Sequence, residues 1–231
     1  MVVELRRSAP ERVAIWAMGG LVALLPLLFL FVGVLTLGED APAGALFLLL
    51  ALPFAGLTYF VLREAAARAS TLVRIEGQGL RLVLPAQRGY APLERVDELL
   101  GLSAIRSIET RVESFRGAGT IVTQRAYALV LNNGRRIVLG GDRRMMEPFF
   151  EGAANAIAQQ TGKPITDLGV IDANAGFILL FGQSAPPWDS APLPQAVGEK
   201  RVRDEQTALQ IAYAVLAVCG LLVALVRLFG G

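Results

Sequence analysis

Two long apolar runs without a charged residue dominate the amino-terminal part of the chain. They are Val13–Leu37 and Pro42–Leu62, and each reaches the roughly 20 residues that an α-helix needs to cross a bilayer core. A cleaved signal peptide is disfavoured, because its apolar part usually has about 7–15 residues. The sequence therefore predicts a hairpin of two transmembrane helices, joined by an acidic link at residues 38–41 and preceded by the capping-box spacing of Ser8 and Glu11.

A third apolar run, Ala208–Val226, lies near the carboxyl end and predicts a third transmembrane helix. Lysine and arginine concentrate on the cytoplasmic side of membrane helices. The link between the first two runs has neither, whereas basic residues lie beside the other ends: Arg6, Arg7, Arg12, Arg63, Arg68, Lys200, Arg201 and Arg203. We therefore expect a protein of the bacterial inner (plasma) membrane, with its amino terminus and the region before the third run in the cytoplasm and its carboxyl terminus outside.

Between Ser70 and Lys163 apolar and polar residues alternate, which is typical of β-strands with one face in a core. The predicted strands are Thr71–Glu76, Leu80–Leu84, Ile105–Phe115 and Thr120–Leu131. The first two flank a Gly-Gln-Gly turn and predict a hairpin. In the third, Glu109, Arg111 and Glu113 occupy alternate positions, so we expect an antiparallel strand with its charged face in water.

Two arginine pairs flank the apolar run that follows the Asn133-Gly134 turn and are the candidate contacts with an anionic lipid or a partner: Arg135, Arg136, Arg143 and Arg144. Asn133-Gly134 predicts a two-residue hairpin turn, which places Arg136 opposite Leu131. Neighbouring side chains on a strand point to opposite faces, so Arg135 and Arg136 cannot hold one phosphate. Three interpretations stay open: a solvated or locally paired face, a membrane-surface contact and a discrete ligand site.

An apolar stripe at helical spacing follows these arginines: Met146, Phe149, Phe150, Ala153 and Ile157. Pro148 suits the first turn of this helix, and Gly162 suits its end. Residues 165–206 are predicted as a proline-rich connector. Within it, residues 176–182 fit an extra strand, a buried loop or an interfacial segment. Trp188 either anchors the chain at the level of the lipid headgroups or covers the domain.

The order of these elements resembles the bacterial pleckstrin-homology-like (PH-like) domains of small membrane proteins. The resemblance rests on VRIEGQGLRLVL, YAPLERVDEL, IRSIETRVESF and YALVLNNGRRIVLGG, followed by a helix that ends near Gly162. It implies a bent antiparallel sheet at residues 70–164, forming a partly open barrel closed by one α-helix. The expected α+β membrane protein thus has a helical hairpin at residues 1–69, this domain, the connector and a third transmembrane helix at residues 207–231.

Composition supports the membrane prediction and disfavours nucleic-acid binding, catalysis and cofactor binding. Hydrophobic residues make up 54% of the chain, whereas about half, glycine included, is usual for a soluble domain. The 22 basic residues nearly balance the 20 acidic ones, and aromatic residues are few in the domain, which disfavours nucleic acid as a partner. With no histidine and only Cys219, the commonest general base and metal ligands are missing. No catalytic or nucleotide-binding motif occurs, so we expect neither an enzyme nor a cofactor.

Two functions remain. In the first, the protein is a non-catalytic accessory or scaffold whose PH-like domain docks on a subunit of a larger membrane complex, for which a respiratory or other energy-converting complex is the suggested host. In the alternative, the basic face of the domain senses anionic lipid of the inner leaflet, where each basic group contributes about 1 kcal/mol. The expected partners are the bilayer itself and other membrane-protein subunits.

Overall fold

The computed structural model describes residues 2–117, 120–144, 147–174, 184–208, 210, 211 and 214. The predicted third span lies almost wholly outside the described residues. So do the apolar stretch at residues 176–182 and Met146 of the predicted helix stripe.

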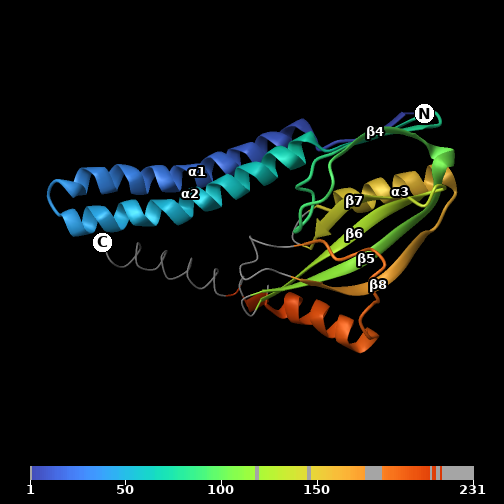
Figure 1. The fold of residues 1–231 in the computed structure, drawn as a ribbon. Helices are drawn as coiled ribbons and strands as arrows, with labels where there is room; N and C mark the ends of the chain where they lie inside the picture. The colour runs from blue at the N-terminus through green and yellow to red at the C-terminus, as the bar shows by residue number, and fades with distance from the viewer. Residues whose placement is uncertain are drawn as a thin grey trace.

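The two predicted amino-terminal spans are helices, α1 (Ala9–Leu37) and α2 (Ala41–Ser70), packed as an antiparallel hairpin. The capping box of α1 forms as predicted: the Ser8 N–H donates to Glu11 at 2.8 Å, and the Glu11 N–H donates to the Ser8 hydroxyl at 3.3 Å. Both helices are long and apolar enough to cross a membrane, and only 11% and 6% of their most apolar stretches are buried. Figure 1 shows the hairpin extending away from the β-rich part of the molecule.

The first sheet, sheet A, contains a strand that the sequence pattern did not predict. Its order is β1 (Val2–Leu5), β2 (Leu72–Glu76), β3 (Gly79–Leu84) and β4 (Val96–Gly101), with all neighbours antiparallel. Strand β1 precedes α1 and pairs with β2, which follows α2. Both ends of the α1–α2 hairpin therefore continue into adjacent, hydrogen-bonded strands.

The second sheet, sheet B, has the order β7 (Arg136–Arg143), β6 (Thr120–Leu131), β5 (Ile105–Gly117) and β8 (Ile165–Asn174). Strand β8 is parallel to β5, although the whole of residues 165–206 was predicted as a connector. The pattern concealed this strand, because Gly169 has a positive φ of 83° and a register irregularity interrupts the pairing near it. Residues 195–208 are also regular and form a helix, although residues up to 206 were predicted as connector.

The core lies between sheet A, one face of sheet B and the helix α3 (Phe149–Thr161). We call this face of sheet B, which carries Ile108 and Leu129, the inner face, and the opposite one the outer face. Helix α3 follows Pro148 and ends at Gly162, whose φ of 67° is left-handed, as predicted. It buries Phe150, Ala153, Ala154 and Ile157.

The hairpin between β6 and β7 differs from the predicted register by one residue. Arg136 pairs with Val130 rather than Leu131, and the Leu131 N–H donates to the Arg135 carbonyl at 2.8 Å. The loop therefore has three residues, and Gly134 has a φ of 83°. Two-residue and three-residue hairpin loops both favour glycine at a positive φ, so the dipeptide alone does not determine the register.

The pairing of β1 generates the first prediction. Val3 is partly buried against the core, whereas the neighbouring Val2 is 54% exposed. Val3→Asp should lower the free energy of unfolding by about 1–3 kcal/mol, because it buries a polar group without a partner. Val2→Asp, the matched control, should change it by less than about 0.5 kcal/mol. Thermal unfolding of the detergent-purified protein, followed by circular dichroism, measures both, and equal losses would mean that β1 does not pack as described.

Candidate functional site

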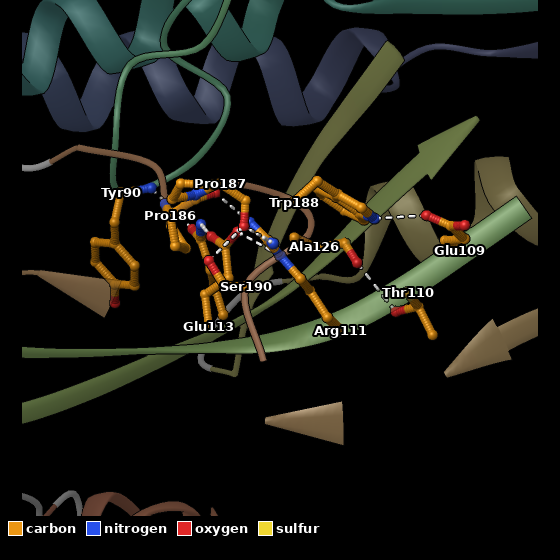
Figure 2. A network of polar contacts seen from close by, with 11 residues as sticks. Tyr90, Glu109, Thr110, Arg111, Glu113, Ala126, Pro186, Pro187, Trp188 and Ser190 are labelled. Atoms are coloured by element: carbon orange, nitrogen blue, oxygen red, sulfur yellow. Dashed lines mark hydrogen bonds and ion pairs between the residues drawn. The ribbon is translucent and has the colours of Figure 1, made fainter. Parts of the chain in front are cut away.

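The charged face of β5 is buried, contrary to the prediction that it faces water. Arg111 is 1% exposed and Glu113 is 3% exposed. The cover is the segment of residues 184–194, which we call the strap. It belongs to the predicted connector and crosses the outer face of sheet B (Figure 2). The alternation in β5 was identified correctly, but a local pattern cannot show that a segment about 75 residues later covers its polar side.

Arg111 is surrounded by acceptors that neutralise and fix its guanidinium. It donates to the Glu113 carboxylate at 2.5 and 3.0 Å, and to the carbonyls of Pro186 and Pro187 at 2.8 Å each. Gln124 donates to the other oxygen of Glu113 at 2.6 Å. A buried ion pair is tolerated when further hydrogen bonds satisfy both partners, and the strap supplies two of them.

Trp188 lies against the domain, which is the covering role that the sequence left open beside a membrane anchor. Its ring stacks on the Arg111 guanidinium, 4.0 Å from the ring centroid, and its indole N–H donates to Glu109 at 2.6 Å. Figure 2 shows the indole reaching along the strand from Arg111 to Glu109. The ring therefore shields the buried cation while its polar edge is satisfied.

After the strap, the chain passes the edge of sheet B, and helix 195–208 packs on the inner face. At the edge, the Leu193 N–H donates to the Val170 carbonyl of β8 at 2.7 Å. Arg201 donates to both oxygens of Asp172 at 2.6 and 3.2 Å, and Glu205 accepts the Thr123 N–H at 2.7 Å. The strap and helix 195–208 thus cover opposite faces of sheet B. In the sequence, the helix leads to the predicted third span.

The first predicted arginine pair does not form a common surface. Arg135 makes two hydrogen bonds to Glu98 at 2.6 and 2.8 Å, which joins the β6–β7 turn to the edge strand of sheet A. Arg136 binds Glu109 and Asp189, each at 3.1 Å, so it ties β7 to β5 and the strap. The two guanidiniums bind different carboxylates, in keeping with the expectation that they cannot share one phosphate.

The second pair connects the domain to α2 and to helix 195–208. Arg143 donates to Glu64 of α2 at 2.7 Å and stacks on Tyr90, 4.1 Å from the ring centroid. Arg144 makes only long contacts with helix 195–208: 3.4 Å to the Val202 carbonyl and to Gln206, and 3.9 Å to Glu205. Arg143 is therefore a structural link to α2, whereas the Arg144 guanidinium keeps donors to spare.

A cavity of about 730 Å³ lies on the inner face between the first turn of α3 and helix 195–208. Tyr127 contributes to its lining, and burial raises the pKa of Tyr127 to about 12. Asp142 accepts the N–H groups of Phe149, Phe150 and Glu151 at 3.1, 3.0 and 2.7 Å, so it caps α3. Burial raises the pKa of Asp142 although these amides lower it. In the part of the chain that the structure describes, no three Asp, Glu or Cys side chains are grouped to hold a metal.

Comparison with protein-family models, with curated proteins and with solved structures finds no match for this chain. The functional argument therefore rests on the residues and contacts themselves.

The buried ion pair generates the second prediction. Arg111→Met leaves Glu113 as a buried charge without its main partner, which should cost about 3–5 kcal/mol. The control Arg125→Met removes an exposed ion pair with Asp167 and should cost at most about 1 kcal/mol. In a Trp16→Phe background Trp188 is the only tryptophan, because the chain has two, so its fluorescence reports unfolding and release of the strap. Similar losses in both variants would contradict the burial of Arg111.

The contact between Arg201 and Asp172 generates a prediction of pH dependence. Hydrogen bonds from Arg201, with attraction from Arg201 and Arg116, hold the pKa of Asp172 below its ordinary value of 3.8. The stabilisation is therefore present above that value and is lost as the pH falls below it. The protection of the amides in helix 195–208 against hydrogen exchange, measured relative to the intrinsic exchange rate at each pH, should fall below about pH 4. Asp172→Asn should raise the exchange at neutral pH and weaken its acid dependence; an unchanged acid dependence would exclude this contact as the cause.

Proposed function

We propose that this chain is a non-catalytic accessory or scaffold protein of a membrane complex, with its β-rich domain on the cytoplasmic side of a bacterial inner membrane. The respiratory or other energy-converting host remains part of this proposal. The supporting observation is the pairing of β1 with β2 at the base of the membrane hairpin. Because both helix ends continue into neighbouring strands, and Arg143 of β7 binds Glu64 of α2, the domain is held at a fixed orientation to the membrane.

A PH-like architecture for this domain belongs to the same proposal. Four antiparallel strands in sheet A, three antiparallel strands (β5–β7) in sheet B and the helix α3 support it. Arg135 and Glu98 join the edges of the two sheets, as a partly closed barrel requires. The parallel strand β8 and the strap are additions to the arrangement that the resemblance implied.

The third transmembrane helix and the outside location of the carboxyl terminus are also proposals. Helix 195–208 directly precedes the apolar run Ala208–Val226, and Glu205 and Arg201 fix it to sheet B. A span that began there would hold the domain to the membrane at a second point, beside the one at the hairpin.

Lipid sensing through the four predicted arginines receives less support. Arg135, Arg136 and Arg143 already bind carboxylates of the chain at 2.6–3.1 Å. An anionic headgroup would have to replace these partners, which reduces the gain from each contact. Scaffolding requires no such exchange.

Strand β4 is the proposed docking edge. It is the outer strand of sheet A, with β3 as its hydrogen-bonded neighbour. Leu99 on this strand is 71% exposed, and the charged pair of Arg81 and Asp97 lies beside it. On its other side, among the described residues, β4 is joined to sheet B by hydrogen bonds only through the side chains of Arg135 and Glu98, and its main-chain groups there can bind an extended segment of a partner through hydrogen bonds.

The test is purification of the full chain from its native membrane in a mild detergent, followed by mass spectrometry. We expect one or more membrane-protein subunits in fixed stoichiometry. Leu99→Lys should reduce their recovery at least tenfold, and Val2→Lys, at the opposite edge of the same sheet, should leave it unchanged. A protein that is recovered alone, under conditions where known membrane complexes stay intact, would refute the scaffold proposal.

A further inference from the structure

We infer that the 730 Å³ cavity between α3 and helix 195–208 binds an anionic amphiphile, namely a hydrocarbon chain that carries a carboxylate or a phosphate. This ligand site is independent of the proposed docking edge on β4. Its volume falls within the roughly 300–1,000 Å³ of typical small-molecule sites.

The apolar part of the cavity comes from side chains of four segments: β5, β8, the strap and helix 195–208. Val112 of β5, Val170 of β8, and Leu193 and Val202 of the strap and the following helix line it, and all four are only half-buried. Elsewhere on the inner face, Ile108 and Leu129 are fully buried. The helix therefore leaves apolar side chains uncovered inside a concave site, which favours a ligand with a hydrocarbon part.

Arginines with unused donors form the polar part. Arg203 lines the cavity and has no hydrogen bond or ion pair to the rest of the described chain. Arg144 lines it with contacts no shorter than 3.4 Å. Arg125 makes a single 3.0 Å contact with Asp167. Guanidiniums bind carboxylates and phosphates through paired N–H donors, so this rim suits an anionic head.

The carboxylates of the lining are largely occupied by the chain itself. Asp142 caps α3, Asp167 accepts from Arg125 and the Gly169 N–H, and Glu199 accepts from Gln195 at 2.9 Å. Glu151 is exposed on the first turn of α3, and its side chain has no hydrogen bond or ion pair within the described ranges. The donors available to a ligand thus outnumber the free acceptors, and Glu151 is the one lining carboxylate without a hydrogen bond or ion pair within the described ranges.

Such an amphiphile can come from the inner leaflet or from a dissolved pool. The experiment uses the full chain in nanodiscs, because detergent would compete for the cavity. In one arm, a photoreactive fatty acid is added to discs of neutral phosphatidylcholine. In the other, the same photoreactive group is carried by the acyl chain of phosphatidylglycerol built into the disc. Labelled peptides are identified by mass spectrometry.

We expect labelling within residues 164–174 and 193–203 in at least one arm, and the arm that labels identifies the source. Arg203→Gln, which removes no contact within the described chain, should weaken labelling about tenfold, the equivalent of about 1.4 kcal/mol. Glu151→Gln should strengthen it, and Arg106→Gln, an exposed arginine outside the cavity lining, should have no effect.

Labelling elsewhere, absence of labelling in both arms, or equal labelling of the Arg203→Gln and unaltered proteins would overturn the assignment. Recovery of companion subunits, measured on the same Arg203→Gln variant, should stay unchanged. A failure of the ligand site is therefore distinguishable from a failure of the scaffold proposal.

Discussion

The buried pair of Arg111 and Glu113 determines how the carboxyl-terminal third of the described chain is arranged. An arginine that is 1% exposed is stable only if nearly every donor has an acceptor, because desolvation of an unpaired charge costs several kcal/mol. Strand β5 itself supplies Glu113, and Gln124 of β6 donates to Glu113, so the two strands leave donors of Arg111 without an acceptor. The carbonyls of Pro186 and Pro187 in the strap supply the two further acceptors that complete the site. The position of the strap then directs the chain round β8 and places helix 195–208 on the inner face.

The helical hairpin of α1 and α2 and the domain form one structure through a short pairing at the hairpin base. Four residue pairs connect β1 to β2, from Val2 with Glu76 to Leu5 with Val73. Without β1, the domain would follow α2 through a single chain connection. With it, two chain connections fix the angle between the helices and sheet A. The hydrogen bond from Arg143 of β7 to Glu64 of α2 adds a third point of attachment. A rigidly presented domain suits a role in which position, rather than chemistry, is what the protein contributes.

The predicted basic face becomes a set of internal links once the fold is formed. Arg135 joins two sheet edges, Arg136 joins a strand to the strap, and Arg143 joins the domain to α2. Their partners Glu98, Asp189 and Glu64 are far away in the sequence, so no local count of charges shows that they neutralise these arginines. Arg144 and Arg203, at the rim of the cavity, keep the unsatisfied donors. The charge available for an external anion therefore comes from one residue of the predicted pairs, Arg144, and from Arg203, which the pairs did not indicate.

Local patterns in the sequence determined the two apolar helices, the β2–β3 hairpin, the long strands β5 and β6, and α3 with its glycine end, because each depends on periodicity and caps within a few residues. Only the tertiary structure decided the pairing of β1 with β2, the parallel strand β8, the register at Gly134 and the burial of Arg111. β1 has four residues, too few for a periodic signal. The strap is recognised only by the strand that it covers, and β8 only by the strand with which it pairs. The residues that bury a polar face come from distant parts of the chain. Burial and charge pairing between distant residues exist only once the chain has folded, so the pattern along one strand does not show them.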